Sequence, residues 1–165
     1  KTLQVAFQYT SELTHAASTL TYYKNKLWVG SYDELKSGYL GAYTIKDKKG
    51  KPTLSQYALT RIPTRVQGIA FTDNGKLILS RSCQTDSSKR GFVHVLDVYK
   101  PDLSKLSDGA ITLGKLLKTW DMPTMNEEIA VSGNYLYVSF ESAAFSTAVK
   151  RMDRVCAFKT KSITE

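Results

Sequence analysis

The feature that most constrains the fold is a segment of 17 or 18 residues that occurs three times. It runs from Thr14 as THAASTLTYYKNKLWVGS, from Thr64 as TRVQGIAFTDNGKLILSR and from Thr124 as TMNEEIAVSGNYLYVSF. The three starts lie 50 and 60 residues apart. Internal similarity at such a period is typical of repeat architectures. We therefore expect three similar units along the chain.

Each repeat predicts a strand, a tight turn and a second strand. The turns are Lys24-Asn25, Asp73-Asn74-Gly75 and Ser132-Gly133-Asn134. Asn and Gly tolerate the positive φ that short hairpin turns need. The segments that follow, 27–31, 77–81 and 136–140, are rich in β-branched and aromatic residues and read as strands.

Further strands are expected in every unit. Third strands are predicted at 38–45, 91–98 and 153–160, fourth strands at 54–62 and 113–122, and an orphan outer strand at 1–9. The predicted fold is all-β and β-propeller-like, with about three four-stranded antiparallel blades. We expect one domain, 1–165, with units at about 10–62, 63–122 and 123–165.

Three blades are too few for a closed ring, because propellers need about four to eight. The prediction is half, or another fragment, of a six-bladed ring that another copy or a second chain completes. The alternative is an antiparallel sandwich of about eleven strands that stands alone. Short helical turns are expected only at 100–105 and 141–151.

Charge and composition exclude several classes of protein. The formal charge is +8, with 42% apolar and 23% charged residues, which is typical of a globular chain. The lysines gather in one connection (46–51) or are scattered, without the basic–aromatic pattern that binds nucleic acid. The apolar runs are too short for a membrane helix. We expect a solvated basic surface, no nucleic acid partner and no membrane span.

Cysteine and histidine give few signals. Cys83 and Cys156 form either one disulfide or two thiols, and the chain has no CxxC motif or Cys/His cluster that would hold zinc. His94 is predicted to pack or hydrogen-bond between blades. Serine catalysis is not expected, because the chain has no G-x-S-x-G motif.

The candidate site lies where the first strands begin. In a propeller these strands line the central channel, and the repeat aligns His15 with Arg65 and Met125, and Gln67 with Glu127. The ends of the second strands lie near the same face. The predicted polar cluster contains His15, Arg65, Gln67, Glu127, Glu128 and Glu141.

Roles follow from the chemistry of these side chains. Carboxylates suit a hard cation such as calcium, so Glu127 and Glu128 are the candidate metal ligands. A His beside a Glu can exchange protons near neutral pH, which makes His15 and Glu127 the catalytic candidates. The ligand-binding candidates are Arg65, Gln67, Arg81 and Glu141. Neighbouring strand residues point to opposite faces, so only one of the two adjacent glutamates is expected to face the axis.

Three groups of motifs carry a resemblance. They are VGSYDELKSGYLGAY, then RVQGIAF with LILSRS, then LYVSFESA with DRVCAF. The chain resembles, over about residues 14–160, the C-terminal half of uncharacterised secreted bacterial proteins with propeller-like repeats. The resemblance implies export and a longer or processed parent chain, and it implies no known reaction. The blade pattern is also loosely similar to six-bladed propellers of the lactonase and strictosidine-synthase type.

Three functions are compatible with these observations. The first is an extracellular propeller module that binds an unknown ligand. The second is a calcium-dependent propeller hydrolase, lactonase-like, with its site at the central channel. The third is a structural chain that completes a ring, favoured by apolar edges at 1–9 and 154–160, because an unpaired edge strand invites another chain.

Overall fold

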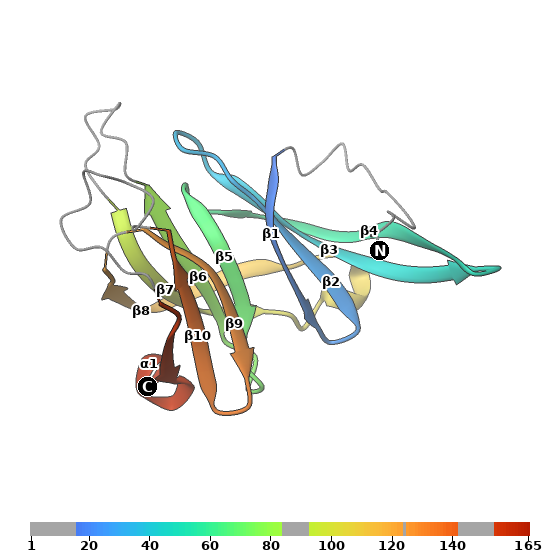
Figure 1. Ribbon diagram of the computed structural model, residues 1–165. Helices are drawn as coiled ribbons and strands as arrows, with labels where there is room; N and C mark the ends of the chain where they lie inside the picture. The colour runs from blue at the N-terminus through green and yellow to red at the C-terminus, as the bar shows by residue number, and fades with distance from the viewer. Residues whose placement is uncertain (1–15, 84–92, 124, 142–153) are drawn as a thin grey trace, which may run out of the picture.

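The described residues of the protein form three antiparallel sheets. The structure is a computed structural model that describes residues 16–83, 93–123, 125–141 and 154–165. In each sheet the strands lie in the order in which the chain forms them (Figure 1). Sheet A holds β1 (Ala17–Tyr23), β2 (Lys26–Ser31), β3 (Gly38–Lys48) and β4 (Lys51–Ile62). Sheet B holds β5 (Val66–Phe71), β6 (Leu77–Cys83), β7 (Val93–Asp102) and β8 (Thr112–Asp121), and sheet C holds β9 (Asn126–Ser132), β10 (Tyr135–Phe140) and β11 (Cys156–Lys159).

Tight turns join the first and second strands of each sheet, as the sequence predicts. Lys24 and Asn25 have φ of 49° and 58°, Gly75 has a φ of 81°, and Gly133 has a φ of 54°. Gly adopts this left-handed region without penalty and Asn at little cost. The all-β class and the three predicted hairpins are therefore confirmed.

The lysine-rich connection is the tip of a long hairpin. β3 and β4 extend to Lys48 and from Lys51, where these two residues pair. Between them Lys49 and Gly50 turn the chain with φ of 56° and 76°. The two strands are therefore longer at this end than the predicted segments 38–45 and 54–62.

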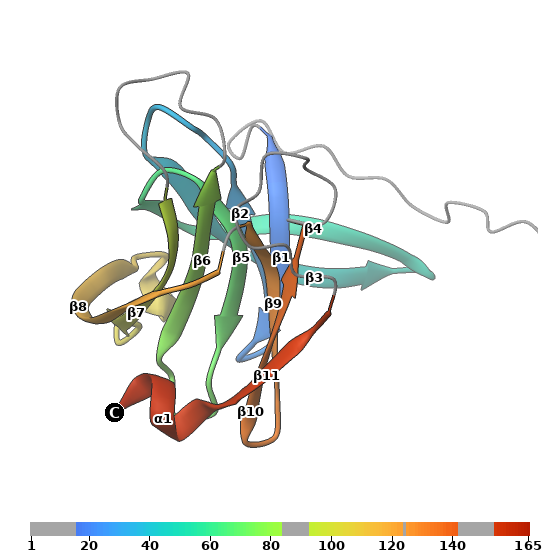
Figure 2. The same cartoon turned by 60° about the vertical axis from the view of Figure 1, so that its left-hand side comes forward.

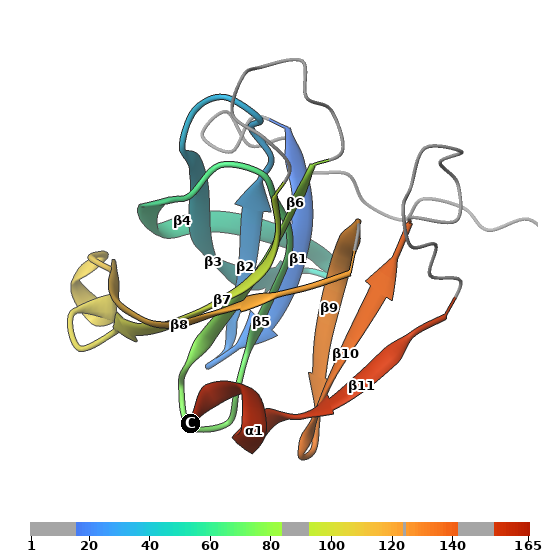
Figure 3. The same cartoon turned by 90° about the vertical axis from the view of Figure 1, so that its left-hand side faces the viewer.

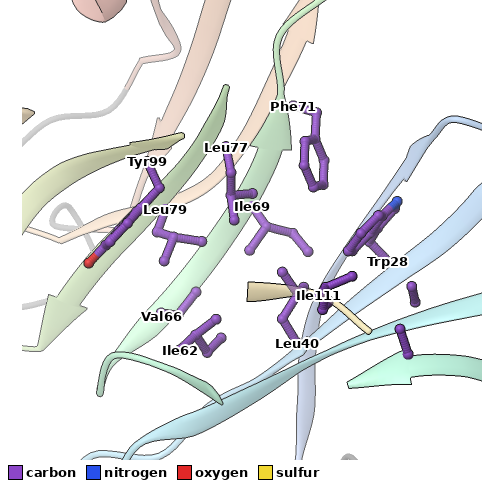
Figure 4. Close-up of a cluster of buried hydrophobic side chains, with 12 residues drawn as sticks. Trp28, Leu40, Ile62, Val66, Ile69, Phe71, Leu77, Leu79, Tyr99 and Ile111 are labelled. Atoms are coloured by element: carbon purple, nitrogen blue, oxygen red, sulfur yellow. The ribbon is translucent and has the colours of Figure 1, made fainter. Parts of the chain in front are cut away.

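The first core lies between sheets A and B (Figure 4). Trp28 is fully buried, and its ring centroid lies 4.8 Å from that of Phe71. The Trp28 indole N–H donates to the Tyr23 carbonyl at 3.0 Å, so the polar atom of this large side chain is satisfied. The other members of the cluster are Leu40, Ala42, Ala58, Ile62, Val66, Ile69, Leu77, Leu79, Tyr99 and Ile111.

The second core lies between sheets B and C. Sheet B contributes Ala70, Ile78, Leu96 and Val98, and sheet C contributes Ile129, Leu136 and Val138. Successive residues of a strand point to opposite faces, so Ile69 belongs to the first core and Ala70 to the second. β5, β6 and the middle of β7 are therefore buried on both faces, whereas β8 is mostly exposed. This burial explains the nearly continuous apolar residues of β5 and β6.

The first strands of the three sheets lie next to one another. β5 contacts β1 on one side and β9 on the other (Figure 1). Figure 2 shows the three strands running close together. Pro63 follows β4 at the end of sheet A, and Pro123 follows β8 near the end of sheet B. The chain thus forms three layered sheets and not the two sheets of a sandwich.

The helical segments differ from the expectation. A helical turn was expected at 100–105, but residues 100–102 belong to β7. A 3₁₀ turn instead lies at Leu106–Asp108. The predicted strand 153–160 ends at Lys159, and α1 (Thr160–Thr164) follows it (Figure 3). α1 is held by Ile163, whose side chain joins the second core and whose carbonyl accepts a hydrogen bond from Trp120 Nε1 at 2.9 Å. The segment 1–9 and residues 142–151 lie outside the described residues.

Candidate functional site

The three sheets begin with the same backbone geometry. Ala16, Arg65 and Met125 stand just before β1, β5 and β9, and have φ of 54°, 65° and 60°. Their carbonyls accept hydrogen bonds, each of 3.0 Å, from the amides of Tyr32, Ser82 and Glu141, respectively. Positive φ is uncommon in residues other than Gly and marks a position that the surrounding structure constrains. The same constraint occurs at the same place in every unit.

A β-bulge follows this start in each first strand. The pairing of β1 with β2 shifts between Ala17 and Thr19, and that of β5 with β6 between Val66 and Gly68. In β9, Glu127 and Glu128 together oppose Ser139 of β10. Bulges turn side chains away from the regular alternation of a strand, so these bulges reorient the residues at the candidate site.

The bulges correct the alignment of the repeats by one residue. The sequence aligned His15 with Arg65 and Met125, whereas Ala16 is the structural equivalent. Ser18, Gln67 and Glu127 are then equivalent, and Thr19, Gly68 and Glu128 follow them. Starting the repeats at Thr14, Thr64 and Thr124 placed Leu20 opposite Ala70 and Ala130, whereas the registers place it opposite Ile69 and Ile129.

The backbones of β5 and β9 approach closely where Gly68 faces Glu128. A Cβ atom on Gly68 would lie 2.6 Å from the Glu127 carbonyl oxygen and 2.8 Å from the Ile129 nitrogen. No side chain fits at such distances. Gly68 therefore brings the bulges of neighbouring sheets together and places the two glutamates beside sheet B.

The carboxylate of Glu128 links first strands. Its Oε2 accepts from Thr19 Oγ1 of β1 at 2.8 Å, and its Oε1 accepts from the Ile129 amide of β9 at 3.0 Å. The buried Thr19 hydroxyl in turn accepts from the Ile69 amide of β5 at 3.1 Å. Burial raises the pKa of Glu128, and the hydrogen bonds from Thr19, Ile129 and Ile69 oppose that shift. The side chain keeps exposed surface but already has partners in all three sheets.

Glu127 is the most perturbed acid of the site. Its Oε1 accepts from Ser82 Oγ, a fully buried hydroxyl at the end of β6, at 3.2 Å. Burial raises the pKa of Glu127 to about 7, with smaller increases from the charges of Glu141 and Glu128 and an opposing effect of the Ser82 hydrogen bond. A carboxyl group of this pKa exchanges protons near neutral pH. The bulge turns both carboxylates toward neighbouring sheets, Glu127 toward Ser82 of sheet B and Glu128 toward Thr19 of sheet A. That only one of them faces a central axis stays a prediction.

The two predicted arginines serve mainly to hold the chain. Arg65 is 2% exposed, its amide donates to the Asp33 carbonyl at 2.7 Å, and its Nε donates to the Glu34 carbonyl at 3.3 Å. Arg81 forms a 2.8 Å ion pair with the buried Asp97. Arg65 therefore holds the loop that contains Asp33 and Glu34, and Arg81 holds β6 to β7.

The remaining predicted residues have different outcomes. Gln67 is half-buried at its bulge, and Glu141 is exposed at the end of β10, close enough to act on Glu127. His15 lies outside the described residues, so its catalytic role stays a prediction. The structure thus brings Gln67, Glu127, Glu128 and Glu141 to one end of the first strands.

A second polar group lies at the ends of the second strands, where the sequence placed Tyr32 and Cys83 near the same face without giving them a role. The Cys83 thiol donates to Glu34 Oε1 at 3.4 Å. Burial and a hydrogen bond to Cys83 raise the pKa of Tyr32. Their position at the ends of the second strands indicated Tyr32 and Cys83, whereas nothing in the sequence indicated Glu34. Cys83 and Cys156 are not joined in a disulfide.

His94 has the predicted role between units. Its Nδ1 accepts from the Met125 amide at 3.1 Å, and its carbonyl accepts from the Met122 amide at 2.8 Å. Asn126, fully buried, donates from Nδ2 to Ser80 Oγ at 2.7 Å. These bonds attach the start of β9 to sheet B and fix the position of Glu127.

The chemistry of the site favours hydrogen bonding and proton exchange. Among the described residues no three His, Cys, Asp or Glu side chains converge as a metal-binding group. Calcium at Glu127 and Glu128 stays a prediction, and it needs oxygen ligands from other parts of the chain or from a partner. In the described parts of the chain, no helix is long and apolar enough to cross a membrane.

Comparison with known proteins gives no family for this chain. Neither a protein-family model nor a curated protein matches the sequence.

Proposed function

We propose that the chain is a segment of a β-propeller that acts as an extracellular binding module. The observation that carries the proposal is the repeated start of the first strands, with its positive φ, its carbonyl hydrogen bond and its bulge. Propeller blades are related by such a repeat. Export is proposed from the resemblance to secreted proteins with propeller-like repeats.

The proposed binding site is the end of the first strands. Polar side chains from three sheets gather there, and loops on a rigid β-scaffold commonly carry function. Glu127 donates a hydrogen bond when protonated and accepts when ionised, and Glu141 adds negative charge nearby. These properties favour a ligand with hydroxyl or amino groups, such as a sugar or a small amine.

A thermal-shift screen with neutral sugars, organic amines and organic acids tests this proposal. We expect compounds of the first two classes to raise the melting temperature of the wild type and to lose that effect in Glu127→Gln. Asp108→Asn is the matched control, because Asp108 is an exposed acid on the 3₁₀ turn. A ligand that stabilises the wild type and Glu127→Gln equally would refute the site.

A hydrolase is the second candidate, and the pKa of Glu127 favours it. A carboxylate with a pKa of about 7 is suited to take a proton from water near neutral pH. Hydrolysis of a lactone panel would then rise with pH around 7 and disappear in Glu127→Gln. Loss of activity with a calcium chelator, and its return with calcium, tests the predicted metal. Activity that persists in Glu127→Gln would exclude Glu127 as the base.

A further inference from the structure

We propose that the outer face of sheet A in one copy packs against the outer face of sheet C in a second copy. "Outer" means the face turned away from sheet B. The inference rests on the proposed propeller arrangement, and it names the partner that continues the stack of sheets. It is argued from the way in which the three sheets of one chain already pack.

The outer face of sheet A carries residues that are core in the other sheets. Through the register at the bulges, Leu20 is equivalent to Ile69 and Ile129, and Tyr22 is equivalent to Phe71. Leu20 is 63% and Tyr22 61% exposed, whereas Ile69, Phe71 and Ile129 are at most 7% exposed. On β2, the half-buried Leu27 and Val29 continue this surface, because they pair with Tyr22 and Leu20. At Leu20 and Tyr22, sheet A therefore presents to solvent the type of face that sheets B and C bury, whereas Tyr43 of β3, which pairs with Leu27 on the same face, is 1% exposed.

The outer face of sheet C is equivalent to the faces with which sheets A and B pack on the next sheet along the chain. Tyr137 pairs with Ala130 as Ile78 pairs with Ala70 and Trp28 with Thr21. Ile78 and Trp28 are fully buried against the next sheet, whereas Tyr137 is 39% exposed. Its ring lies 6.4 Å from that of Tyr135, which is 42% exposed. Exposed neighbouring tyrosines are typical of protein interfaces.

The two outer faces are of the same two types as the faces that pack on each other within the chain. The Trp28 face of sheet A packs on the Ile69 face of sheet B, and the Ile78 face of sheet B packs on the Ile129 face of sheet C. The next step of this series places the Tyr137 face on the equivalent of sheet A's outer face. A second copy carries that face. Two such contacts, one in each direction, would form a closed pair of identical chains.

Sedimentation of the purified wild type tests the inference. We expect a species of twice the chain mass of 18.4 kDa. Tyr22→Lys on sheet A and Tyr137→Lys on sheet C should each shift it toward the single chain, because a charge is buried in the contact. Both side chains are exposed in the single chain, so folding should persist, which circular dichroism verifies. Leu116→Lys is the matched control, because Leu116 is 45% exposed on β8 and lies on neither outer face.

Mixing the two variants identifies which faces meet. Tyr22→Lys keeps an intact sheet C face and Tyr137→Lys an intact sheet A face, so the mixture should contain more dimer than either variant alone. Equal amounts would refute the contact between unlike faces. A wild type that stays at 18.4 kDa, or that associates only with a different chain, would refute the second copy as partner. A monomer with Glu127-dependent ligand binding would retain the proposed function while losing this inference.

Discussion

The pKa of Glu127 gives a prediction about stability that a single substitution can test. The folded pKa of about 7 lies above the ordinary value of 4.5, so the folded state binds the proton more tightly than the unfolded state does. The corresponding stabilisation is complete below pH 4.5 and is lost as the pH rises through 7. Stability should therefore decrease across this range through ionisation of Glu127.

The expected change in unfolding free energy follows from the difference between the folded pKa and the ordinary pKa of Glu127. Their difference corresponds to about 3 kcal/mol, and solvent at the half-buried carboxylate reduces this to on the order of 1–2 kcal/mol. Glu127→Gln remains neutral at every pH, and its amide oxygen can still accept the Ser82 hydrogen bond. The variant should match the wild type near pH 4.5 and exceed its unfolding free energy above pH 7.

Urea unfolding followed by tryptophan fluorescence measures this difference at a series of pH values. Asp108→Asn removes an exposed carboxylate and should run parallel to the wild type. Parallel curves for Glu127→Gln and the wild type across this pH range would refute the argument, because ionisation of Glu127 would then have no cost in the folded state.

Three further substitutions probe the contacts that hold the site. Gly68→Ala should cost about 1–3 kcal/mol in urea unfolding, because its Cβ would meet the backbone of β9; a neutral result would contradict the close approach of β5 and β9. Asp97→Ala should cost on the order of 3 kcal/mol, since it removes the partner of Arg81; a double-mutant cycle with Arg81→Met should show coupling, and strict additivity would argue against the pair. Trp28→Ala should cost about 3–5 kcal/mol through loss of the first core; calorimetry would show a lower melting temperature, and an unchanged one would place Trp28 outside the core.

The sequence was sufficient to predict the sheets because their signals are local. Turn residues such as Asn25 and Gly75 adopt positive φ, and the apolar segments between turns have the length and composition of strands. The order of strands then follows, because consecutive antiparallel strands joined by short turns pair with each other.

The candidate site was only partly predictable because its geometry depends on contacts between sheets. The sequence singled out Glu127 and Glu128, but the bulges in β1, β5 and β9 leave no pattern in one sequence. Pairing of Glu127 with Ser82 and of Glu128 with Thr19 joins residues 45 and 109 positions apart. Likewise α1 was missed, because it is anchored by Trp120 and not by a local signal.

The burial of β5, β6 and the middle of β7 on both faces has a consequence for the dynamics of the chain. Proteins open in cooperative parts, and the parts with the most buried contacts open last. Sheets A and C each have one face against sheet B, so either can detach in a sub-global opening while the middle sheet keeps its other neighbour. Amide protons of β5, β6 and β7 should then exchange with deuterium most slowly, at the rate of global unfolding. The middle sheet is thus the common nucleus to which the other two attach, and the link between Glu128 and Thr19 breaks whenever either of them leaves it.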